Sequence, residues 1–274
     1  IGVTGVQTCA LPILAIKKNS GRDSDALRFT ENGILAEGGT YRMPANFGKI
    51  TGLSFQSIGD TASGQGDLIV FCEKGAVTFL VSERDRSKWS SINGFQRVLF
   101  PDIGCASGKS LVNINSDIFW RSFDGIRSYS NARKDTNSAF GYVPLSNEIR
   151  TITERDSSSY LYRSSSAYFD NRLFVTVSPR QDLRGLADLK TDTSALKPVT
   201  FQGLAVYDFA SILSAGGQKS AVWEGLWFCG DILQVLSTGF GPKARCFIFR
   251  NDLLPDQDRK STRLNSSHAN ISYA

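Results

Sequence analysis

Short apolar runs that end at turn residues recur along most of the chain. Residues 67–75 read DLIVFCEKG, residues 117–125 read DIFWRSFDG and residues 231–239 read DILQVLSTG. A looser fourth copy, residues 171–179, reads NRLFVTVSP. In each copy an Asp or Asn opens a strand-like run, and a Gly or Pro follows eight positions later. The copies start 50, 54 and 60 positions apart, and a hairpin that recurs at such a period is typical of repeat β architectures.

Two of the copies predict clear β-hairpins. The run 68–72 is continuous and apolar, and Lys74-Gly75 after it predicts a turn in which glycine takes a positive φ. In the second copy Asp124-Gly125 stands between two apolar runs, which is the strongest short-range hairpin signal. Further strands are expected at residues 49–55, 95–100, 167–177, 201–209, 221–228, 232–236 and 245–249.

Helix signals are scarce. One short helix is predicted at residues 146–156, where Ser146 follows Pro144 as an N-cap and Ile149 and Ile152 share a face. Residues 131–142 are expected to be a polar loop. The sequence therefore predicts an all-β protein. The recurring hairpin favours a β-propeller with about four visible blades over a sandwich or a barrel.

The positions that mark the repeat are interpreted as structural rather than as site residues. They are Asp67, Gly75, Asp117, Gly125, Asn171, Asp231 and Gly239. The Asp side chains are expected to accept backbone N–H bonds in the preceding turn, and no clustered Asp/Asn loop accompanies them as calcium binding would need. Large aromatic residues in the runs are expected to pack between blades: Phe71, Phe119, Trp120, Phe174, Trp223 and Trp227.

The two ends of the chain are left out of the predicted domain. Residues 1–14 and 259–274 resemble translated sequencing-adapter read-through, which occurs at the ends of reading frames from assembled environmental DNA. We interpret them as non-native, which leaves residues 15–258 as a partial propeller domain and predicts that the gene continues past both ends. The one histidine, His268, lies in the closing stretch.

Charge, cysteine spacing and hydropathy argue against several classes of function. The formal charge is +5, and about +3 without Arg259, Lys260, Arg263 and Asp258, so nucleic-acid binding is not indicated. Four cysteines remain outside the opening stretch, without ligand spacing, and are expected to be buried reduced thiols: Cys72, Cys105, Cys229 and Cys246. No apolar run reaches the ~20 residues of a membrane helix.

The sequence contains little evidence for a catalytic site. Residues 104–110, GCASGKS, have three residues between the first Gly and the Gly-Lys pair where a phosphate loop has four, and a strand-like segment follows; we expect an exposed loop. A Ser-His-Asp triad lacks a native histidine. A glycosidase pair could come from the carboxylates Asp85, Asp102, Asp124, Asp135, Glu148 and Glu154, but their spacing selects none. We therefore predict no catalytic, cofactor or metal site.

A family resemblance covers about residues 50–210. Its markers are GDLIVFCEKGAVTFL at 66–80, GCASGKSLVNINSDIFWRSFDGIRSY at 104–129, LSNEI at 145–149 and YFDNRLFVTV at 168–177. These segments resemble propeller-type structural proteins of tailed bacteriophages, of the neck, packaged-DNA stabilisation or tail tubular kinds.

The resemblance implies a non-enzymatic virion protein that assembles in the host cytoplasm. It implies a homo-oligomeric ring in contact with portal, adaptor or tail components and no membrane; direct nucleic-acid contact stays open but is not indicated. Two alternatives stay open. One is a carbohydrate-active or carbohydrate-binding propeller with a carboxylate-lined pocket. The other is a generic interaction propeller of a cell.

Overall fold

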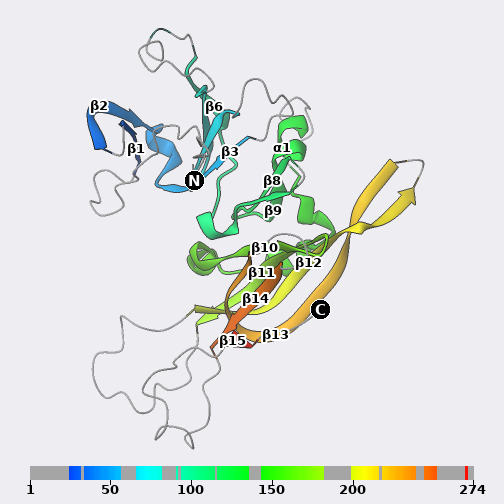
Figure 1. The fold of residues 1–274 in the computed structure, drawn as a ribbon. Coiled ribbons are helices and arrows are strands. Elements are labelled where there is room, and N and C mark those ends of the chain that lie inside the picture. The colour runs from blue at the N-terminus through cyan, green and yellow to red at the C-terminus, as the bar shows by residue number, and fades with distance from the viewer. Residues whose placement is uncertain are drawn as a thin grey trace, which may run out of the picture. The chain divides into compact units, whose positions relative to one another are not determined.

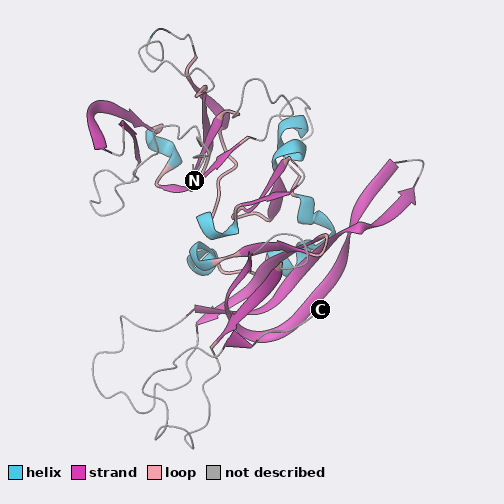
Figure 2. Cartoon of the chain, viewed as in Figure 1, coloured by secondary structure: helices cyan, strands magenta, loops and turns pink. Residues whose placement is uncertain are grey.

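The computed structural model describes residues 25–31, 34–56, 66–81, 91, 94–114, 116–135, 143–181, 199–215, 218–238, 244–251 and 269–270. This part of the chain is mostly β, as the sequence predicts (Figures 1 and 2). Each of its sheets is antiparallel. The chain divides into two compact units, Ile1–Gly104 and Cys105–Ala274.

The first unit contains a two-stranded and a four-stranded sheet. The hairpin is β1 (Ala26–Glu31) with β2 (Ile34–Arg42), and a 3-10 helix η1 (Ala45–Phe47) follows. The second sheet is a meander in sequence order: β3 (Ile50–Phe55), β4 (Leu68–Cys72), β5 (Ala76–Phe79) and β6 (Gln96–Phe100). All five β4 residues are buried, because an apolar run without alternation is covered on both faces.

The second unit starts with a small sheet and short helices. The sheet comprises β7 (Val112–Ile114), β8 (Asp117–Arg121) and β9 (Ile126–Ser128). The helices are η3 (Gly108–Ser110), α1 (Tyr129–Asp135), η4 (Leu145–Ile149), α2 (Arg150–Thr153) and η5 (Ser158–Arg163). A large sheet follows in sequence order: β10 (Ser166–Phe169), β11 (Arg172–Gln181), β12 (Val199–Ala215), β13 (Gln218–Thr238), β14 (Arg245–Arg250) and β15 (Ala269–Asn270).

Strands β10–β14 curl into a nearly closed barrel. Ser165, just before β10, accepts a 2.9 Å hydrogen bond at its Oγ from the Val235 N–H of β13, which brings non-neighbouring strands together. The barrel encloses one core cluster: Ala167, Phe174, Phe201, Leu204, Val206, Ile232 and Val235. On its outer face Leu173, Val175 and Ala205 pack with Ile114, Phe119 and Ile126 of the small sheet. The large sheet therefore has an apolar core on each face.

The first two copies of the repeat form the same hairpin. In each, the backbone N–H of one residue donates to the carbonyl of the glycine three positions later, which encloses a two-residue turn: Cys72 to Gly75 at 2.8 Å, and Ser122 to Gly125 at 2.7 Å. A 3-10 segment that begins after a proline packs against each glycine, through Phe47 in one unit and through Pro144 and Ser146 in the other. The repeat is thus structural at these two copies.

The positive φ predicted for Gly75 was wrong. Neither Gly75 nor Gly125 has a positive φ. A Cβ on Gly75 would lie 2.8 Å from the Phe47 ring, and a Cβ on Gly125 would lie 2.5 Å from Ser146 Oγ. Close packing therefore selects glycine at both positions.

The other two copies do not form this hairpin. Asn171 lies with Asp170 in the two-residue turn between β10 and β11, where both take positive φ as in a type I′ turn. The run after it continues through Pro179 inside β11 instead of turning. Asp231 lies inside β13, at a bulge in the pairing with β12 rather than at a strand start, and Gly239 falls outside the described residues. The expectation of four equivalent blades was therefore wrong, because this part of the chain builds the barrel.

The helix prediction needs two corrections. Residues 145–153 are helical, but as a 3-10 helix followed by one α turn, with Pro144 and not Ser146 at the N-cap. Ser146 is unavailable as a cap because its Oγ accepts a hydrogen bond from the Ile126 N–H at 3.0 Å. The start of the predicted polar loop is α1. No helix within the described ranges is long and apolar enough to cross a membrane.

The six aromatic residues pack against other apolar residues, as predicted, but the packing is not between propeller blades. Five of the six are buried, and Trp227 is partly buried against Phe174 with ring centroids 5.4 Å apart. Tyr207 and Trp223 have centroids 4.8 Å apart on the outer barrel face. These contacts lie within the cores of the barrel and the small sheet.

Replacing Gly75 or Gly125 by alanine should destabilise the protein by about 1–3 kcal/mol, because the added methyl overpacks its site. Denaturant unfolding of the full chain would measure this. Lys74→Ala at the exposed turn is the control, expected within about 0.5 kcal/mol of wild type. Unchanged stability in both glycine variants would show that the packed 3-10 segments do not constrain the turns.

The four cysteines of the described chain are free thiols, as predicted, with Cys72 and Cys105 buried and the other two partly buried. Burial, and then Glu73 and Asp25, raise the pKa of Cys72 to about 12. In a Cys9→Ser variant at pH 8, Cys72 and Cys105 should therefore react with Ellman's reagent only after unfolding. Rapid reaction of Cys72 in the native protein would contradict this core assignment.

Candidate functional site

A pocket in the second unit lies beside the β8–β9 turn. Its volume is about 390 Å³. The turn contributes Asp124, and η4 and α2 contribute Asn147, Arg150 and Glu154. Val143 adds an exposed apolar wall. The pocket thus combines two carboxylates, a guanidinium and an amide, groups that can bind a polar ligand.

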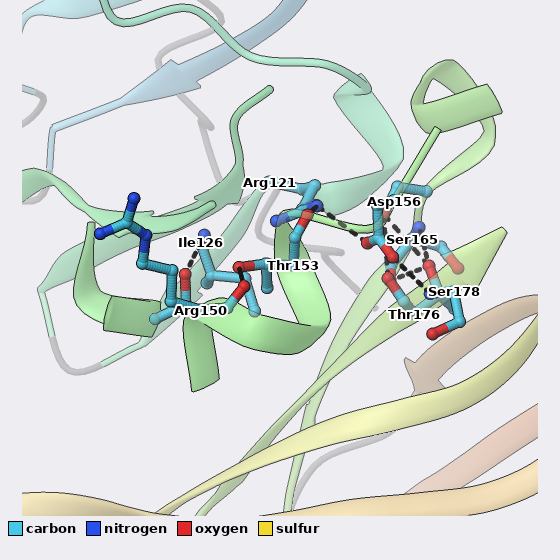
Figure 3. Close-up of polar contacts among 10 residues, drawn as sticks. Arg121, Ile126, Arg150, Thr153, Asp156, Ser165, Thr176 and Ser178 are labelled. Carbon is cyan, nitrogen blue, oxygen red and sulfur yellow. Dashed lines mark hydrogen bonds and ion pairs between the residues drawn. The ribbon is translucent and has the colours of Figure 1, made fainter. Parts of the chain in front are cut away.

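Hydrogen bonds to neighbouring elements position the wall formed by η4. The Ile126 N–H of β9 donates to Ser146 Oγ, which holds η4 against the hairpin (Figure 3). On the barrel side, Trp223 Nε1 donates to the Leu145 carbonyl at 3.1 Å. Leu145, Ile149 and the α2 residue Ile152 pack on the outer barrel core.

A buried ion pair lies below the α2 wall. Arg121 Nη2 lies 2.8 Å from Asp156 Oδ2, and the side chains are 0% and 1% exposed. Arg121 Nη2 also donates to the Thr153 carbonyl, and Asp156 Oδ1 accepts from the Ser178 N–H of β11 at 2.9 Å (Figure 3). The pair therefore connects β8, the end of α2 and the barrel.

Burial dominates the energetics of this pair. It lowers the pKa of Arg121, and it raises the pKa of Asp156 although the Arg121 charge and the Ser178 N–H act in the opposite direction. Arg121 Nε and Nη1 have no hydrogen-bond partner among the residues that the structure describes. Each charge is thus compensated mainly by the other, so removing one leaves an uncompensated buried charge.

Both pocket carboxylates are already in ion pairs. Asp124 pairs with Arg127, and Glu154 pairs with Arg150 at 2.5 Å on the exposed face of α2. Burial acts to raise the pKa of Asp124, but the Arg127 hydrogen bond and charge, with Ser122, outweigh it and lower that pKa. Asp124 is therefore suited to binding as an anion, and not to donating a proton near neutral pH.

The other candidate carboxylates do not join them. Asp102 belongs to the first unit, and Asp85 falls outside the described residues, as does the side chain of Asp135. Glu148 acts on Tyr207, whose pKa is raised first by burial and then by this charge. Of the six carboxylates considered from sequence, the structure brings Asp124 and Glu154 to one pocket.

Asp117 has a structural role, but not the predicted one. Its Oδ1 accepts from the Ile118 N–H at 2.8 Å and the Ser130 N–H at 2.9 Å, and its Oδ2 accepts from Ser128 Oγ at 2.6 Å. These groups lie in its own strand, at the end of β9 and at the start of α1, whereas the preceding turn was expected. Asp117 therefore caps α1.

Asp67 and Asp231 differ from Asp117. The Asp67 backbone carbonyl accepts from Gln56 N–H at 2.9 Å, and burial raises the pKa of its side chain despite the opposing charge of Arg97. Asp231 Oδ1 accepts from Arg180 Nη2 at 2.8 Å, so its carboxylate joins β13 to β11. The three Asp positions thus share a sequence pattern but not a role.

The loop at residues 104–110 is more buried than predicted, from Gly104 through Ser107. Ser107 Oγ accepts from the Lys109 N–H and caps η3, while Ser110 Oγ donates to the Ser107 carbonyl at 2.6 Å. Ser110 Oγ also accepts from the Arg121 N–H at 3.0 Å. The serine hydroxyls are therefore used within the fold and do not form a phosphate site.

A scan against protein-family models finds no match, and no curated protein matches the chain. Sequence similarity therefore supports no family assignment. Among the described side chains, no group of three or more His, Cys, Asp or Glu lies close enough together to hold a metal ion.

The buried Arg121–Asp156 pair was not predicted from the sequence. Arg121 stands at the end of the apolar run IFWR, and a charge at a buried strand position requires a partner. That signal was present in the sequence. The partner, 35 positions away, could not be identified from spacing.

Asp156→Ala should destabilise the second unit by about 3–5 kcal/mol, because it leaves the Arg121 charge buried and uncompensated. The double variant Arg121→Met/Asp156→Leu should lose less than the single variant, since it removes both charges. Denaturant unfolding of each variant gives the comparison.

The exposed Arg150–Glu154 pair supplies a matched control on the same helical segment. Replacing both residues by alanine should change stability by about 1 kcal/mol or less. A double variant at 121 and 156 that is no more stable than Asp156→Ala would contradict the account of the buried pair.

Proposed function

We propose that this chain is a non-enzymatic structural protein of a tailed-bacteriophage virion, which acts in the neck or tail through protein–protein contacts. The observation that supports this most is the duplicated hairpin, in which a two-residue turn, a closely packed glycine and a proline-started 3-10 segment recur in both units. The recurrence agrees with the repeat organisation of the phage proteins that the sequence resembles.

We also propose that the first two copies derive from propeller blades. The β3–β6 meander has the strand number and order of a blade, and β7–β9 has three strands in the same order. The barrel β10–β14 then represents an additional domain that provides contact surface. Partners are other virion proteins and further copies of the chain in a ring.

The ion pairs of the pocket carboxylates also favour a non-enzymatic role. A glycosidase needs one carboxylate that holds a proton and one that acts as base or nucleophile. Here Asp124 and Glu154 each pair with an arginine, and the pKa of Asp124 is lowered. Asp124 therefore lacks the raised pKa of a general acid.

Gene context tests the virion role directly. If the virion role is right, portal, terminase or tail genes are expected next to this reading frame on its parent DNA. A long flanking sequence without any virion gene would contradict the proposal.

Carbohydrate binding is the second candidate, favoured by the Asp124, Asn147 and Glu154 groups around the pocket. Calorimetric titration of the chain with oligosaccharides, alongside Asp124→Asn and Glu154→Gln variants, tests it. The virion proposal predicts no saturable binding at this pocket. Binding that the variants abolish would instead support the carbohydrate function.

A further inference from the structure

Strands β12 and β13 continue past the barrel as a pair of strands. β11 pairs with β12 as far as Asp208, and β14 pairs with β13 only from Ile232 onward. Beyond these limits β12 and β13 pair with each other, as far as Ala215 with Gln218. Figure 1 shows this paired end extending beyond the other strands of the second unit. We call residues 209–221 of β12 and β13 the arm.

A bulge separates the arm from the barrel. The β12–β13 register shifts between Asp208 and Leu213, so that residues 209–212 of β12 lie opposite Ala221 of β13. At this bulge the Ala210 N–H donates to Asp208 Oδ1 at 2.8 Å. A bulge bends the strand that carries it. The arm therefore departs from the direction of the barrel strands.

Two strands alone do not form a stable sheet. A two-stranded hairpin is marginally stable in water unless a third strand or another packed element supports it. β11 does not supply this strand, because it begins at Arg172, opposite Asp208, where the arm starts. No other strand in the part of the chain that the structure describes pairs with the arm. The arm therefore needs a further strand from elsewhere.

The two edges of the arm differ in charge. Ala215 and Gln218 are the last paired residues, with two residues between them, and in such hairpins this pair is hydrogen-bonded. The next pair, Ser214 with Lys219, then directs its N–H and C=O groups away from the hairpin, one residue on each edge. Lysine on an edge strand opposes the addition of another strand. The β12 edge has no charged residue from 211 to 215.

We propose that the β12 edge of the arm pairs, antiparallel and around a two-fold axis, with the same edge of a second copy of this chain. Self-pairing needs an edge that does not repel its own copy, and the uncharged β12 edge meets this condition. The N–H and C=O groups of Ser214 gain partners, and the two hairpins become one four-stranded sheet. This two-fold contact does not depend on the virion role, and it differs from the head-to-tail contacts that close a ring.

Analytical ultracentrifugation of the full chain over a concentration series tests the proposal. The wild-type chain should show a concentration-dependent dimer. Ser214→Pro removes the N–H that faces the second copy and leaves the β12–β13 hydrogen bonds in place, as edge strands tolerate. This variant should lose the dimer while its circular dichroism spectrum stays β-rich. A wild-type chain that stays monomeric, or a Ser214→Pro variant that associates as tightly as wild type, overturns the proposal.

Charge exchange at Ser214 identifies the partner edge. With the two hairpins aligned, both copies of Ser214 lie directly opposite or on the diagonal, within about 8 Å. Ser214→Lys and Ser214→Glu should therefore each weaken self-association at least about 10-fold, and an equimolar mixture should regain at least the wild-type affinity. A mixture that does not recover the dimer overturns the proposal.

The other edge of the arm supplies a matched control. Lys219→Gln removes the charge opposite Ser214 and should change the dimer affinity by about 3-fold or less, since exposed charges are screened by salt. Loss of the dimer in Lys219→Gln would place the contact on β13 and overturn the assignment to the β12 edge.

Discussion

The second unit depends on the buried pair of Arg121 and Asp156. Asp156 is bonded on one side to a strand of the small sheet and on the other to the Ser178 N–H of the barrel. Arg121 also holds the Thr153 carbonyl at the end of α2. Ser178 has a positive φ of 56° and no Cα partner in the β11–β12 register, so its N–H is directed away from the ladder. One ionic contact thus fixes three elements.

The Arg121–Asp156 pair and its hydrogen bonds explain the position of the pocket. Arg121 holds the end of α2, and the Ile126 and Trp223 N–H groups hold η4, so both helical segments stay beside the β8–β9 turn. Asp124 of the turn then faces Asn147 and Glu154. The pocket is a consequence of how the hairpin and barrel are connected.

The sequence predicts the strands well and their assembly poorly. Local patterns such as the apolar run of β4 and the Asp124-Gly125 turn depend on neighbouring residues, so they are visible in the sequence. Asp231 shows where prediction from local sequence fails. Its Asp-apolar pattern is the one that opens β8, but here it lies at a bulge in the middle of β13. The strand continues through this position because β13 pairs with both β12 and β14. That Asp124 and Glu154 line one pocket likewise depends on η4, whose position is set by tertiary hydrogen bonds.

Native-state hydrogen exchange at the Ser178 amide tests the central role of the buried pair most directly. If Asp156 holds this N–H as described, Ser178 should exchange as slowly as the Val175 amide in the strand core, through unfolding of the whole unit. In Arg121→Met/Asp156→Leu, Ser178 should lose its protection while Val175 keeps it. Fast exchange of Ser178 in the wild-type chain would contradict the account.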